Sequence, residues 1–127
     1  MKRLSLMLVP ALLAATPAYA TSSIHCRTAN GPDIWLVVPN ERGAGVTQAR
    51  IVIGREELVT GETRGGPWVS RGTVNQRLLS LRVAPGGASG TLLLLNATRR
   101  GVPYVGNVTF RGRSWPVRCF WDEDDEE

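Results

Sequence analysis

Histidine, cysteine and long apolar runs are scarce in this sequence, and each scarcity excludes a class of protein. A single histidine, His25, leaves no second imidazole for a metal site or for most acid–base mechanisms. Neither a C-x-x-C nor a G-x-S-x-G motif occurs, which argues against a redox site and a serine hydrolase. The 127 residues include 14 glycines and 8 prolines, so a coiled coil and a multidomain enzyme are also excluded.

The first twenty residues have the features of a secretory signal peptide. Lys2 and Arg3 precede an apolar stretch over residues 4–15, and an A-x-A motif ends at Ala20. The apolar stretch is too short to cross a bilayer as a helix, so we expect cleavage after Ala20 and no membrane span. The sequence therefore predicts a periplasmic or secreted protein, for which nucleic acid is an unsuitable partner.

The charge is distributed unevenly along the chain. We expect a leader over residues 1–20, one domain over 21–121 and a solvated tail over 122–127. The tail consists entirely of acidic residues: Asp122, Glu123, Asp124, Asp125, Glu126 and Glu127. It is interpreted either as a solubility tail or as an electrostatic contact, made with an arginine-rich face of the same domain or with a cationic partner.

After removal of the leader, arginine is the only basic side chain that remains besides His25. The domain then carries thirteen arginines against five carboxylates. Arginine binds phosphate and carboxylate in a bidentate manner, but it also replaces lysine in proteins of GC-rich genomes. Because the arginines are scattered along the chain, the sequence favours the compositional explanation.

The two cysteines predict one structural disulfide. Cys26 lies near the start of the mature chain and Cys119 near its end, and export would bring both into an oxidising compartment. Closing a loop of about 93 residues removes about 4 to 5 kcal/mol of unfolded-chain entropy. The bond would hold the first and last strands together.

Short alternating segments separated by turn residues predict an all-β fold. The patterning indicates about eight short antiparallel strands that form a small barrel or sandwich. In the last strand, over residues 114–121, Trp115, Val117, Cys119 and Trp121 share one face, the face that a buried disulfide requires. Arg111-Gly112 predicts the tight hairpin that precedes this strand.

Candidate functional residues are few. No catalytic residue, metal ligand or cofactor site is assigned, and His25 is expected on the surface or on an edge strand. Two of the turn carboxylates could in principle flank a glycosidic bond, from the set Asp33, Glu41, Glu56, Glu57 and Glu62. Trp68, with Arg64 and Arg71 nearby in a glycine-rich region, is the best candidate for ligand binding.

The end of the chain resembles a hairpin found in other proteins. Tyr104 to Gly112 has the pattern Y-x-G-x-V-x-F-x-G, and Val117 to Cys119 adds V-x-C. This pattern is similar to the closing hairpin of many small exported proteins of unknown function in Gram-negative bacteria. The expected architecture also resembles the periplasmic inhibitors of c-type lysozyme, which are small disulfide-linked β-barrels. Their inhibitory Ser-Gly-x-x-Tyr loop has no counterpart, since Thr91-Leu92-Leu93 follows Ser89-Gly90.

Three functions remain open at this point. The first is a non-enzymatic periplasmic binding or interaction module, whose partner is a cationic envelope protein or an anionic glycan. The alternative is an inhibitor of a cationic cell-wall hydrolase, and the third is an enzyme that acts on envelope glycans. The small catalytic inventory favours the first.

Overall fold

The computed structural model describes residues 21–39, 45–87 and 90–122. The expected leader and the acidic residues from Glu123 to Glu127 lie outside these ranges. All regular structure in the described residues is β, as predicted, with nine strands where the sequence indicated about eight. The strands are β1 (Thr21–Arg27), β2 (Asp33–Pro39), β3 (Gln48–Ile53), β4 (Glu56–Val59), β5 (Trp68–Val74), β6 (Leu78–Ala84), β7 (Leu93–Arg99), β8 (Tyr104–Phe110) and β9 (Arg113–Trp121).

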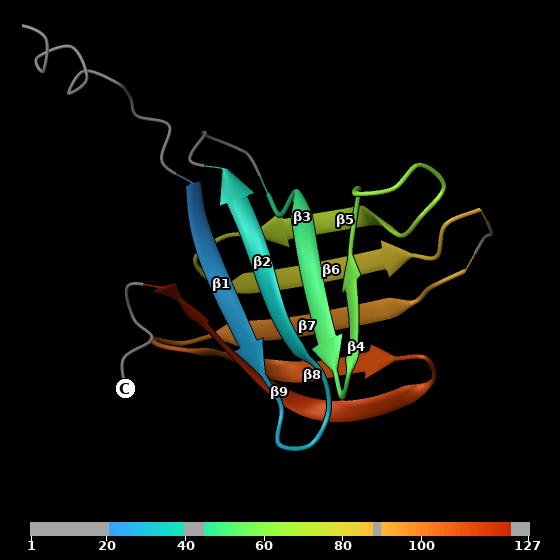
Figure 1. The fold of residues 1–127 in the computed structure, drawn as a ribbon. Helices are drawn as coiled ribbons and strands as arrows, with labels where there is room; N and C mark the ends of the chain where they lie inside the picture. Colours follow the sequence, from blue (N-terminus) through green and yellow to red (C-terminus); the bar gives the residue numbers. More distant parts are fainter. Residues whose placement is uncertain (1–20, 40–44, 88–89, 123–127) are drawn as a thin grey trace, which may run out of the picture.

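The strands form one curled antiparallel sheet in the order β4-β3-β2-β1-β9-β8-β7-β6-β5. Two meanders, β1 to β4 and β5 to β9, are joined in this sheet by the pairing of β1 with β9. Figure 1 shows β1 to β4 crossing steeply over β5 to β8, while the long strand β9 curves from one layer to the other. The sheet is therefore a half-barrel whose two layers enclose the core.

Close backbone approach brings the open sides of the half-barrel together. The amide of Val46, just before β3, donates a hydrogen bond of 3.1 Å to the carbonyl oxygen of Gly72 in β5. A Cβ atom on Gly45 would lie 1.8 Å from that same oxygen, and one on Gly72 would lie 2.4 Å from the carbonyl oxygen of Val46. Only residues without a side chain fit at this contact.

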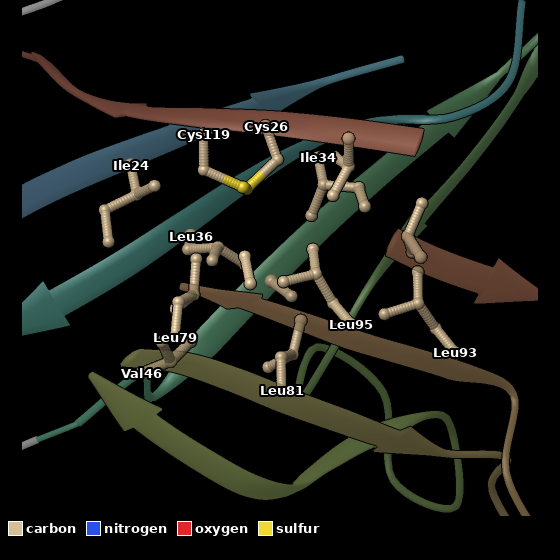
Figure 2. Packing of buried hydrophobic residues seen from close by; sticks show 14 of the residues in the cluster. Ile24, Cys26, Ile34, Leu36, Val46, Leu79, Leu81, Leu93, Leu95 and Cys119 are labelled. Atoms are coloured by element: carbon tan, nitrogen blue, oxygen red, sulfur yellow. A yellow bond between two sulfur atoms is a disulfide. The ribbon is translucent and has the colours of Figure 1, made fainter. Parts of the chain in front are cut away.

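The inward faces of both layers form the core. Figure 2 shows Ile34 and Leu36 of β2 pointing toward Leu79, Leu81 and Leu95 of the opposite layer. All five side chains are fully buried. Alternate positions of each strand supply these residues, as period-two patterning requires.

The predicted disulfide is present at the seam between the two meanders. Cys26 and Cys119 are directly opposite in the β1–β9 register, are fully buried and are linked by a disulfide bond across 93 positions of sequence. The predicted inward face of the last strand is confirmed as well. Val117 is buried beside Cys119, and Trp115 and Trp121 pack against the core.

The predicted hairpin before β9 is confirmed by its backbone. Arg111 and Gly112 have φ angles of 51° and 85°. Positive φ at both central residues is the signature of the tight turn that matches the twist of two antiparallel strands. The turn fixes the β8–β9 register, in which Phe110 is opposite Arg113.

Candidate functional site

The ligand-binding candidates from the sequence do not form a recessed site. Trp68 begins β5 and is 52% exposed, as expected for it, and Arg71 is exposed on the same strand beyond a β-bulge. Arg64 is exposed in the connection before β5. None of the three surface hollows described below is lined by any of these side chains. Small-molecule sites are concave, so the exposure of Trp68 alone does not indicate one.

Two of the turn carboxylates, Glu56 and Glu57, are held by arginines, and Glu41 lies outside the described residues. Glu56 accepts two hydrogen bonds of 2.7 Å from the guanidinium of Arg111, and Glu57 accepts one from Arg50. The hydrogen bonds from Arg111 lower the pKa of Glu56. A glycosidase general acid needs the opposite shift to stay protonated near neutral pH. Glu56 is therefore suited to an ion pair and unsuited to the role of proton donor.

His25 is on an interior strand, so the expected alternative of an edge strand was wrong. Its side chain lies on the outer face of the sheet, between the inward-facing Ile24 and Cys26, which agrees with the other alternative, the surface. It is on β1 between β2 and β9, and its side chain is only 17% exposed. Its ring stacks on Trp35 with a centroid distance of 4.4 Å, and its Nε2 atom lies 3.9 Å from Asp33. Arg50 lies over the ring of Trp35. These contacts on the outer face of the sheet cover His25. They come from other strands, so the sequence around His25 does not predict them.

A first hollow of about 480 Å³ opens at the β1–β9 seam, where Phe120 is opposite His25 in the strand register. Its floor includes Phe120, and the guanidinium carbons of Arg27 and Arg118 lie 5.2 and 5.9 Å from the centre of that ring. Arg27 and Arg118 are directly opposite in the β1–β9 register. Like charges at such positions repel each other, so folding alone does not explain this pair. Contact with the ring holds both cations at the hollow.

Two further hollows lie along the β6–β8 part of the sheet. One, of about 530 Å³, is lined by Arg77, Thr98, Arg99 and Arg100. The other, of about 350 Å³, shares two of those residues and is completed by apolar side chains. Its lining consists of Thr98, Arg100, Val102, Pro103 and Val105. The amide of Arg99 donates a 3.0 Å hydrogen bond to the carbonyl oxygen of Arg77, which fixes the turn before β6 against the end of β7.

The strand registers place these three hollows on neighbouring strands of the sheet. Arg118 of the first hollow is opposite Val105 of the third, and Val105 is in turn opposite Thr98, which the second and third hollows share. We call this region the arginine surface. It comprises Arg27, Arg77, Arg99, Arg100 and Arg118, with the hollows between them.

Within the part of the chain that the structure describes, no carboxylate lines any of the three hollows. Asp33, Glu56 and Glu57 contact His25, Arg111 and Arg50 respectively. The compositional explanation drawn from the scatter of arginines does not account for this clustering in space.

Other kinds of site find no support in the described ranges. No group of three or more histidine, cysteine, aspartate or glutamate side chains there is arranged to hold a metal ion. The described part of the chain also contains no helix long and apolar enough to cross a membrane. No family model matches the chain, and no curated protein or solved structure matches it either.

Proposed function

We propose that the protein is a non-enzymatic binding module of the periplasm that takes an anionic partner on the arginine surface. The observation that carries this proposal is the gathering of five arginines from four separate segments of the chain around three neighbouring hollows, without a described carboxylate among the lining residues. Arginine is suited to this task because its planar guanidinium binds phosphate and carboxylate with two parallel hydrogen bonds.

The fold supports a binding role because it holds these arginines on a stiff frame. Arg27 and Arg118 project from two strands joined by the Cys26–Cys119 disulfide. Arg99 ends β7 and lies over the ring of Tyr104, which is buried and donates a 2.6 Å hydrogen bond to the carbonyl oxygen of Asn75. Cations that are already positioned lose less side-chain entropy when a ligand binds.

The arginine surface also distinguishes this proposal from the alternative of a hydrolase inhibitor. A cationic cell-wall hydrolase would be repelled by such a surface, and like charges across an interface disfavour association. The acidic residues that could attract a cationic partner, Glu123 to Glu127, lie outside the described residues. We therefore place the binding function on the arginine surface and assign an anionic chemistry to the partner.

Binding to a soluble polyanion tests the proposed function. The probe is dextran sulfate, with uncharged dextran as the control, and the affinity is measured by titration at several salt concentrations. The variant R99A/R100A removes two arginines of the surface, and R55A/R64A removes the same charge from exposed turns elsewhere.

We expect R99A/R100A to bind dextran sulfate at least tenfold more weakly and to shrink the salt dependence by about two counterions. R55A/R64A is expected to remain within about twofold of the parent protein, because charges remote from the surface act only at long range. Equal losses in the two variants would show that net charge alone drives binding. That result, or no binding by the parent protein, would overturn the proposal.

A further inference from the structure

Exposed apolar side chains gather on one part of the arginine surface. In the described residues, the large hydrophobic side chains that are exposed are Trp68, Leu78, Val102 and Val105. Leu78 begins β6, Val102 lies in the connection between β7 and β8, and Val105 is in β8. Single exposed valines are ordinary on protein surfaces, but three of four beside a cluster of arginines require an explanation.

The strand registers place Leu78 and Val105 in one row across three strands, and Val102 lies in the connection beside it. Leu78 is opposite Thr98, and Thr98 is opposite Val105. Val102 and Val105 line one hollow together with Arg100. Val102 is 56% exposed and Val105 is 51% exposed, so about half of each side chain is available for contact.

Arginines flank this row on the same part of the sheet. Arg77 directly precedes Leu78, Arg99 ends β7, and Arg100 begins the connection that carries Val102. Thr98 and Arg100 line both the arginine hollow and the apolar one. Arginine and apolar side chains therefore line the same hollow and are not separated into two patches.

We propose that this β6–β8 face docks on a membrane surface rich in anionic phospholipid. Its guanidinium groups would bind lipid phosphates, while Val102, Val105 and Leu78 would enter the boundary between headgroups and acyl chains. Interfacial binding combines these two terms, charge attraction and burial of apolar side chains. A free polyanion would engage the arginines but would leave the valines in water. The inference rests on the proposed function and names the partner of the same surface.

Sedimentation with vesicles tests the inference on the full chain. The vesicles contain phosphatidylcholine either alone or with phosphatidylglycerol, and each variant is also titrated with dextran sulfate. The variant V102T/V105T keeps the shape and β-propensity of both side chains while adding hydroxyl groups. The control W68S removes the large exposed hydrophobic residue that lies away from the arginine surface.

We expect the parent protein to sediment with the phosphatidylglycerol vesicles and not with phosphatidylcholine alone. V102T/V105T should bind the anionic vesicles about tenfold more weakly and keep its affinity for dextran sulfate, because it loses only apolar burial. R99A/R100A should lose both kinds of binding, and W68S should keep both.

Three outcomes would overturn the inference. The first is unchanged vesicle binding by V102T/V105T, and the second is an equal loss caused by W68S. The third is a parent protein that binds dextran sulfate but no anionic vesicle, a result that leaves the proposed function intact. A parent protein that binds neither probe removes both proposals.

Discussion

Loss of the Cys26–Cys119 disulfide is expected to remove a large part of the stability of this domain. The bond closes a loop of 93 residues, and it lies where β1 and β9 join the two meanders of the sheet. The chain-entropy relation for a loop of that length gives about 4.6 kcal/mol at 25 °C. With a urea m value of about 1.5 kcal/mol per M for a domain of this size, the midpoint falls by about 3 M.

The measurement is urea unfolding followed by tryptophan fluorescence, with and without dithiothreitol. Trp115 and Trp121 pack against the core and report on its integrity. Domains of about 100 residues have total stabilities of about 5 to 15 kcal/mol, so the reduced protein is expected to be marginally folded.

The variant C26A/C119A provides the control for this experiment. It lacks the disulfide, so dithiothreitol should leave its unfolding curve unchanged. Both cysteines are fully buried, and the variant is expected to be somewhat less stable than the reduced parent because it also loses the packing of two sulfur atoms. A loss below about 1 kcal/mol on reduction, at an unchanged m value, would refute the loop-entropy argument.

Four further predictions concern the frame and its charges. G72A should lose about 1 to 3 kcal/mol of unfolding free energy in a urea titration, because its methyl group would meet the carbonyl oxygen of Val46. The control T73A, on the exposed side of β5, should change the unfolding free energy little. Y104F should lose about 1 kcal/mol, since it removes the hydrogen bond to the Asn75 carbonyl, and a loss near zero would contradict this assignment. The pKa of Glu56 is lowered from its ordinary value of 4.5, so its ion pair stabilises the protein above that pH, and this stabilisation is lost as the pH falls through the lower pKa of the folded state. E56Q should therefore flatten the dependence of the unfolding midpoint on acidic pH. An identical pH profile in E56Q and the parent protein would disprove this assignment. Deletion of residues 122–127 removes six negative charges, so the shortened protein should elute later from a cation exchanger, and an unchanged elution position would exclude exposure of the tail charges to the resin.

Local sequence patterns predict most of the strands and turns of this fold. Alternation along the last strand placed Val117 and Cys119 inside, and Arg111-Gly112 identified the turn before it, because both signals act over a few neighbouring residues. The disulfide partners required no choice, since the sequence has only two cysteines. The strand order was beyond reach from such patterns, because it depends on pairings between distant segments.

The candidate site shows the same division between local and distant information. Arg27, Arg77 and Arg118 are widely separated in the chain, and only the registers of β1, β9, β8, β7 and β6 bring them to one surface. Trp68 was favoured by its glycine-rich surroundings, a correct signal of exposure that says nothing about a hollow. The arginine surface could be found only once the order of the strands in the sheet and their registers were known.

The position of β9 in the sheet has a consequence for how the chain folds. β9 follows every other strand in sequence, yet it pairs with β1 in the interior of the sheet. Contacts between such distant segments close slowly, so folding is expected to be limited by this pairing. Until β9 docks, β1 and β8 would each present an open row of backbone groups to other chains. A chain shortened within β9 would therefore gain two unprotected edges, and we expect it to aggregate where the full chain folds.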